Sequence, residues 1–232
     1  MLIAGNWKMF KGVAETAEYC RALRDADLGD VDVVVCPPFT ALATAVQVLA
    51  GTDVGVFAQN VHWQDEGAFT GEVSCAMLRE LGVYGTVVGH SERRQYFCET
   101  DETVARRVEG ALGAGLHVIA CVGETERERE AGETEAVLRR QLSVLEPDDS
   151  LVIAYEPVWA IGTGKTATPE LAQEAHAFVK SLIDLPVLYG GSVKPDNAAD
   201  LLSQPDVDGA LVGGASLDAD SFAAICRAGS RS

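Results

Sequence analysis

The sequence predicts a (β/α)8 barrel, a closed ring of eight parallel strands in which each strand is followed by a helix. Two observations lead to this prediction. Eight short apolar runs recur at fairly regular intervals along the 232 residues, and stretches of helical periodicity lie between them. The runs are apolar almost throughout, which is typical of parallel strands buried on both faces. A doubly wound open sheet is the structural alternative.

The expected strands are short and rich in β-branched residues. They are Leu2–Gly5, Val31–Cys36, Val54–Ala58, Thr86–Gly89, His117–Val122, Leu151–Tyr155, Pro186–Tyr189 and Asp208–Val212. The expected helices between them carry apolar residues every three or four positions. They are Ala14–Ala26, Thr40–Ala50, Glu102–Ala114, Glu133–Leu145, Pro169–Ile183, Pro195–Ser203 and Asp218–Ala228.

No linker or change of composition divides the chain, so we expect a single catalytic domain over residues 1–232. The longest connection without periodicity is Gln59–Ser74, which contains two glycines and two aromatic residues. A loop of this length is usually functional or packs against something.

Charge and cysteine content exclude several classes of function. Lys and Arg total 18 against 35 Asp and Glu, a net charge of -17, so we expect neither nucleic acid nor an anionic membrane as a partner. Six cysteines without a Cys-x-x-Cys pair fit neither a zinc site nor a small disulfide scaffold, and indicate reduced thiols in the cytoplasm. The apolar stretch before Asn6 is too short for a signal peptide or a membrane span.

In a parallel barrel the active site lies at the carboxyl ends of the strands, so the polar residues at those positions are the candidates. They are Asn6 and Lys8 after the first strand, His90 after the fourth, Glu156 after the sixth, Gly190, Gly191 and Ser192 after the seventh, and Gly213 and Gly214 after the eighth. A carboxylate can take a proton from a carbon next to a carbonyl if a second group stabilises the developing oxyanion. Glu156 is the candidate carboxylate, and His90 and Lys8 are the candidate stabilising groups.

The two glycine turns predict a phosphate site. Glycine lets backbone N–H groups approach a phosphate closely, and the turn from Gly213 to Ser216 can open a short helix whose positive end faces the dianion. Such a site acts at short range, whereas the negative charge of the surface is screened beyond about 8–10 Å.

The segment after Glu156 predicts a hinged lid. This segment has a stiff first part, a small apolar middle part and a last part with the sequence Thr-Gly-Lys. It consists of Pro157, Val158, Trp159, Ala160, Ile161, Gly162, Thr163, Gly164 and Lys165. Closing the lid would exclude water from Glu156 and protect a reactive enediolate.

Five segments, spread in matching order over essentially the whole chain, resemble the triosephosphate isomerases. They are Ala4–Met9, Val88–Arg94, Ala154–Lys165, Tyr189–Val193 and Gly209–Ala215. The resemblance implies a TIM barrel that interconverts dihydroxyacetone phosphate and glyceraldehyde 3-phosphate, in glycolysis and gluconeogenesis. It also implies proton transfer through an enediolate, with no cofactor and no metal.

The resemblance further implies a role for each candidate residue. Glu156 would be the base that moves the proton, His90 the neutral electrophile on the carbonyl, Lys8 the cation beside the oxyanion, and Asn6 a residue that positions the substrate. The remaining roles are phosphate binding by amides near Gly162, Ser192, Gly213 and Gly214, walls around the carboxylate from Ile161 and Leu211, and support of the site by Glu92.

The loop Gln59–Ser74 resembles the family's interdigitating dimer loop, which implies a homodimer in which Thr70 reaches the neighbouring subunit near its Asn6. Two kinds of departure from the family stand out. Phe10-Lys11-Gly12 follows Met9 where the family commonly has Asn-Gly, which affects dimer contacts near the first loop. The chain is also short between Leu145 and Leu151, and between Ile183 and Pro186, so we expect the outer fifth and sixth helical regions to be trimmed.

Other conspicuous residues are expected to have structural or surface roles. We assign His62, His117 and His176 to such roles, Cys121 to packing in the barrel, and Trp63 to packing in the dimer loop. The run Glu124–Glu130 alternates in charge and predicts a solvated surface.

Two other functions remain open. A different ketol isomerase of phosphorylated sugars would share the glycine turns, but it would not need the set of Asn6, Lys8, His90 and Glu156. A noncatalytic phosphate-binding scaffold is the second alternative, because a fold alone does not establish activity.

Overall fold

The computed structural model of the chain describes residues 1–158 and 167–230. Its strands close into a barrel in chain order, with every neighbour parallel and the last strand paired with the first. They are β1 (Leu2–Asn6), β2 (Asp32–Cys36), β3 (Val54–Ala58), β4 (Gly85–Val88), β5 (His117–Val122), β6 (Leu151–Tyr155), β7 (Val187–Tyr189) and β8 (Gly209–Val212). The (β/α)8 barrel predicted from the sequence is confirmed, and the doubly wound open sheet is excluded.

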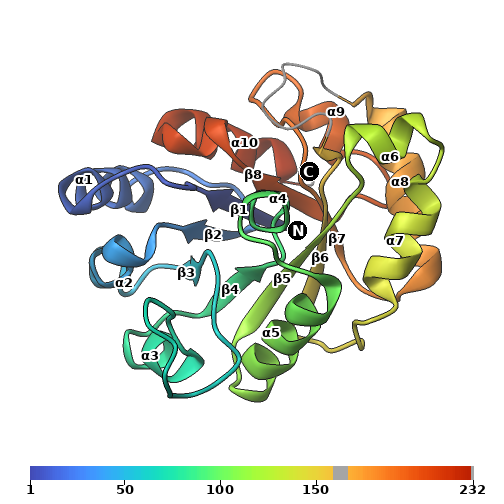
Figure 1. Cartoon of the computed structure of the whole chain (residues 1–232). Helices are drawn as coiled ribbons and strands as arrows, with labels where there is room; N and C mark the ends of the chain where they lie inside the picture. The colour runs from blue at the N-terminus through green and yellow to red at the C-terminus, as the bar shows by residue number, and fades with distance from the viewer. Residues whose placement is uncertain (159–166, 231–232) are drawn as a thin grey trace.

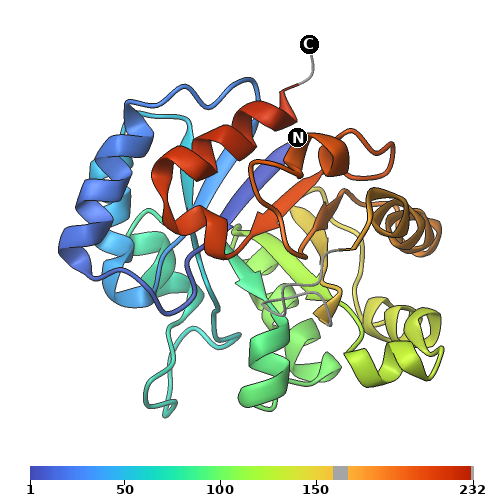
Figure 2. The ribbon, with the colours of Figure 1, turned by 90° about the horizontal axis from the view of Figure 1, so that it is seen from above.

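The helices lie outside the ring of strands (Figures 1 and 2). They are α1 (Val13–Arg24), α2 (Leu42–Leu49), α3 (Cys75–Glu80), α4 (Ser91–Tyr96), α5 (Asp101–Gly113), α6 (Glu126–Glu130), α7 (Thr134–Leu142), α8 (Pro169–Leu182), α9 (Ala198–Leu202) and α10 (Ala219–Gly229), with short 3-10 helices η1 (Phe39–Ala41) and η3 (Gly214–Leu217). Within residues 1–158 and 167–230, no helix combines the length and the apolar character needed to cross a bilayer.

Successive residues of each strand pack into two different layers, which explains the continuous apolar runs. Ala4, Val34 and Ile119 belong to a cluster of buried residues inside the barrel. Their neighbours Ile3 and Val33 belong to a larger cluster between the strands and the helices. Both faces of the sheet are therefore dry, as parallel sheets require.

Some helices differ from the sequence prediction. The stretch Thr40–Ala50 is divided between η1 and α2, and Pro195–Ser203 forms only the short α9. In the second case the Lys194 amide donates to Asn197 Oδ1 at 2.8 Å, which makes a turn where the helix was expected to begin. Helix α3 was not predicted; Ser74 caps it by accepting from the Met77 amide.

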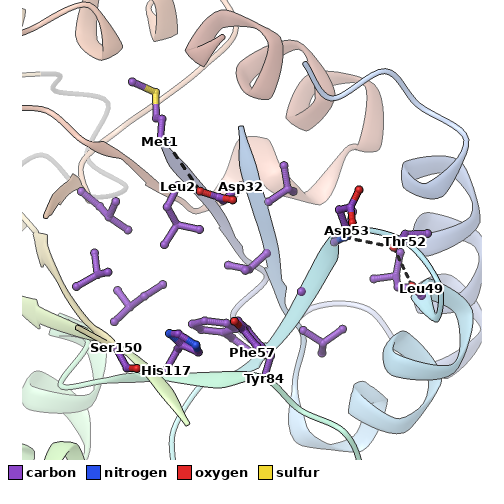
Figure 3. Close-up of a pocket in the computed structure, with 18 of the residues that line it drawn as sticks. Met1, Leu2, Asp32, Leu49, Thr52, Asp53, Phe57, Tyr84, His117 and Ser150 are labelled. Carbon is purple, nitrogen blue, oxygen red and sulfur yellow. Dashed lines mark hydrogen bonds and ion pairs between the residues drawn. The ribbon is translucent and has the colours of Figure 1, made fainter. Parts of the chain in front are cut away.

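A hollow of about 1110 Å³ lies at the amino ends of the strands. Figure 3 shows its lining, where Tyr84 stacks on His117 with ring centroids 4.4 Å apart and Asp32 faces the Met1 amino group at 3.9 Å. None of the predicted site residues that the structure describes lines this hollow. Because catalysis in parallel barrels takes place at the carboxyl ends, the candidate site is at the opposite end.

Candidate active site

A second pocket, of about 710 Å³, opens at the carboxyl ends of the strands. The strands deliver the predicted residues to it from across the chain. Its lining includes Asn6, Lys8, His90, Glu156, Gly190, Gly191, Ser192, Leu211, Gly213 and Gly214. Residues more than two hundred positions apart are neighbours here because β1 and β8 are paired.

Glu156 follows β6 and is almost completely buried, with a relative exposure of 2%. Its Oε2 accepts from the Ser91 amide at 2.8 Å, and its Oε1 accepts from Ser91 Oγ at 3.3 Å. Oε1 also lies 3.0 Å from His90 Nε2. The carboxylate therefore has polar partners for both oxygens, as a buried charge requires.

His90 caps α4, and its ring orientation fixes its tautomer. Nδ1 accepts from the Glu92 amide at 3.2 Å, so the proton of a neutral imidazole lies on Nε2. The Glu92 carboxylate is 3.8 Å from Nδ1, too far for a hydrogen bond. Nε2–H is thus the donor that faces Glu156 and the pocket.

Lys8 is held through its backbone and its side chain. Its amide donates to Asn6 Oδ1 at 3.0 Å, and its Nζ donates to Glu92 Oε1 at 2.7 Å. Its backbone φ is 51°, in the left-handed region that side chains with a Cβ seldom adopt. The ammonium group is therefore placed at the pocket by an unusual backbone conformation and by Glu92.

The glycine turns supply open backbone at the far side of the pocket. Gly213 precedes η3, and a Cβ built on Gly213 would lie 3.5 Å from Lys8 Cε. A Cβ on Gly214 would meet nothing within 4 Å, so its backbone is free of crowding from the protein. A cation and glycine backbone beside open space are thus combined, an arrangement that suits an anion such as phosphate.

The comparisons with known proteins agree with this geometry. Residues 1–229 match the sequence model of the family described as triosephosphate isomerase. The chain belongs to the triosephosphate isomerase family. Relatives named triosephosphate isomerase from Alkaliphilus metalliredigens and Carboxydothermus hydrogenoformans are 51% and 50% identical, each over 97% of this chain and 97% of the relative. A relative of that name from Solibacter usitatus is 51% identical, again over 97% of both chains.

The first two residues of the expected lid lie beside Glu124, whose position differs from the sequence prediction. Pro157 and Val158 are described, and the Val158 amide donates to the Glu124 carbonyl at 3.2 Å. Glu124, expected on a solvated surface, has a relative exposure of 0% and accepts from Tyr155 Oη at 3.1 Å. The prediction was wrong for Glu124, because local charge alternation carries no information on a partner from β6, whereas Glu126, Arg127 and Glu130 are exposed as predicted. The other expected lid residues, Trp159, Ala160, Ile161, Gly162, Thr163, Gly164 and Lys165, lie outside the described residues.

The loop Gln59–Ser74 is fixed at its base and exposed at its tip. The His62 amide donates to the Val73 carbonyl at 2.8 Å, and the His62 ring stacks on Trp63 with centroids 4.2 Å apart. Arg107 donates to the Val61 carbonyl from α5. Thr70 is exposed at the tip and does not line the pocket of its own subunit.

Sequence reasoning missed several residues at the site, of which Ser91 and Gln59 contact predicted site residues directly. Ser91 supplies two donors to Glu156, and Gln59 contacts the Lys8 carbonyl at 2.8 Å. Gln59 follows β3 directly, so its position at a strand end was the signal that could have identified it. Within the part of the chain that the structure describes, no group of three or more His, Cys, Asp or Glu side chains is arranged to hold a metal.

Proposed function

We propose that the chain interconverts dihydroxyacetone phosphate and glyceraldehyde 3-phosphate, with Glu156 as the base and His90 as the electrophile. The observation that carries this proposal is the 3.0 Å contact between Glu156 Oε1 and His90 Nε2 in a pocket that also contains Lys8 and two glycine turns. A proton acceptor and a hydrogen-bond donor that share one small space can act on adjacent atoms of one substrate.

The reaction moves one proton between two adjacent carbons and one between their two oxygens. Glu156 removes a proton from the carbon next to the carbonyl, the C–H electrons form a C=C bond, and the carbonyl electrons move to the oxygen. His90 Nε2–H donates to that oxygen, and the Lys8 ammonium stabilises its negative charge. The hydroxyl proton on the first carbon then passes by way of His90 Nε2 to the former carbonyl oxygen, so that the C=O bond can form at the first carbon. Glu156 returns its proton to the carbon that carried the carbonyl, so no further reactant is needed.

Before the first step Glu156 must exchange its partners. The carboxylate is hydrogen bonded to Ser91, and a substrate carbon has to replace these contacts. The binding energy of the phosphate, which is remote from the reacting carbons, is available to drive this change and the closure of the lid.

The phosphate is proposed to bind to backbone amides of Ser192, Gly213, Gly214 and Gly162, with Lys8 and Asn6 nearby. The open backbone at Gly214 and the Lys8 side chain beside Gly213 support this assignment. Leu211, which is buried and lines the pocket, would limit the access of water to Glu156, as would Ile161 from the lid.

We also propose a homodimer assembled through the loop Gln59–Ser74, with Thr70 near Asn6 of the partner. The exposed loop tip and the exposed side chains of Met9 and Phe10 beside the pocket support it. We further propose that residues 1–232 form a single catalytic domain. A location in the cytoplasm is supported by the six cysteines, all of which are free.

The test is conversion of glyceraldehyde 3-phosphate to dihydroxyacetone phosphate, coupled to glycerol-3-phosphate dehydrogenase. We expect Glu156→Gln to lose about 10²–10⁴-fold in kcat. Glu174→Gln, which removes an exposed carboxylate on α8, is the matched control and should keep the wild-type rate. A folded but inactive wild type would refute the isomerase and favour the phosphate-binding scaffold.

A further inference from the structure

The carbonyl of Lys8 has a partner that the mechanism above does not use. Gln59 Nε2 donates to the Lys8 carbonyl at 2.8 Å, and it also donates to the Cys36 carbonyl at 2.8 Å. A primary amide nitrogen carries two hydrogens, so both are used on carbonyls. The Gln59 side chain therefore links the segment after β1 to the end of β2.

The Cys36 carbonyl belongs to a rigid part of the barrel. Cys36 is completely buried, is paired with Asn6 in the β1–β2 ladder, and its carbonyl also accepts from the Trp7 amide at 3.2 Å. Gln59 itself follows β3 directly. Three strand ends thus determine where the Lys8 carbonyl lies.

The conformation of Lys8 is costly without such support. At a φ of 51° its Cβ crowds the backbone, a cost that residues other than glycine, asparagine and aspartate seldom bear. Asn6 Oδ1 accepts from the Lys8 amide on one side, and Gln59 donates to its carbonyl on the other. The two contacts together fix both peptide planes that flank the Lys8 Cα.

We propose that Gln59 is a positioning residue, which holds the backbone of Lys8 in the left-handed conformation and so directs its ammonium to the developing oxyanion. The proposal rests on the proposed function for the role of Lys8. Gln59 does not line the pocket, so it acts through Lys8 and not on the substrate.

The first test compares Gln59→Met with Gln47→Met, which changes an exposed glutamine on α2. A displacement of about 1 Å of a catalytic group can cost about 10²-fold, so we expect kcat/KM of Gln59→Met to fall by about 10- to 100-fold. Gln47→Met should keep the wild-type value, and the melting temperatures of both variants are measured beside it. Gln59→Glu, which keeps the shape of the side chain but lacks both N–H donors, replaces Gln59→Met if that variant fails to fold.

A double-mutant cycle separates positioning from general stability. In a Lys8→Met background, Gln59→Met should cause little further loss of kcat/KM, because the group that it positions is already absent. The same fold-loss in both backgrounds would show that Gln59 is only structural, and would overturn the proposal.

The second measurement does not depend on activity. In a crystal structure of Gln59→Met, we expect Lys8 to leave the left-handed region. A Lys8 φ still near 51° with its Nζ still on Glu92 would overturn the proposal, even if the wild-type chain proved not to be an isomerase.

Discussion

Gly190, the residue after β7, leaves the space in which the Glu156 side chain lies. A Cβ built on Gly190 would be 2.8 Å from Glu156 Cγ and 3.0 Å from the Tyr155 carbonyl oxygen. Ordinary carbon contacts are about 3.5 Å or longer, so Gly190→Ala must displace Glu156 Cγ by about 0.7 Å. Since a shift of about 1 Å in a catalytic group costs about 10²-fold, a shift of about 0.7 Å should lower kcat/KM by about 25-fold.

The assay is steady-state isomerisation beside thermal unfolding. Gly113→Ala is the matched control, because a Cβ there meets nothing within 4 Å, and it should keep the activity. Overpacking at Gly190 should also cost about 1–3 kcal/mol of stability. If a folded Gly190→Ala variant kept the wild-type kcat/KM, the prediction would be refuted, because the added Cβ would then not have displaced Glu156 from its working position.

Three further changes test other parts of the molecule. Cys98 is exposed and has a φ of 56°. Cys98→Gly should relieve the strain of this left-handed conformation and raise the free energy of unfolding by about 0.5–1 kcal/mol. A denaturant titration measures the change, with Cys98→Ser as the control. Burial lowers the pKa of His176 to about 4, so between about pH 6.5 and 4 the unfolded chain gains a proton that the folded chain does not. The free energy of unfolding should fall by up to about 3 kcal/mol as the pH is lowered across that window. His176→Gln should make the free energy of unfolding depend less steeply on pH, and equal slopes for the variant and the wild type would contradict the lowered pKa of His176. Arg107→Met removes the donor to the Val61 carbonyl and should destabilise the loop that follows by about 1–3 kcal/mol, seen as faster hydrogen exchange over residues 59–74; unchanged exchange would refute it.

The strands could be predicted because each one is marked by the residues of its own short segment. A parallel strand buried on both faces is an unbroken apolar run, so each of the eight predicted runs overlaps a strand of the barrel, with ends that differ by one residue or less. Helix limits were harder, because turns such as that between Lys194 and Asn197 compete with the first helical turn. The residues at the carboxyl ends followed from the strands, since a closed barrel brings those ends together.

What the sequence could not predict depends on partners from distant segments. Glu124 lies in a charged run, yet its carboxylate is buried and accepts a hydrogen bond from Tyr155 of β6. Burial also raises the pKa of Tyr155, with the Glu124 charge as a second cause, so the hydroxyl keeps its proton as the donor. The position of Gln59 was hidden for the same reason, because its carbonyl partners lie at the ends of two other strands, after β1 and at the last residue of β2.

Because β8 pairs with β1, the chain can be circularly permuted. A closed ring has no first strand, and the two ends of the described chain meet at the amino ends of the strands: the Asp30 amide donates to Ser230 Oγ at 2.8 Å, and a Cβ on Gly229 would lie 2.9 Å from Met1 Sδ. A short linker joining these ends would leave every ladder intact. A circular permutant opened in a helix-to-strand connection at that same end should therefore fold and keep its pocket, whereas a break in a loop at the carboxyl ends would divide the site.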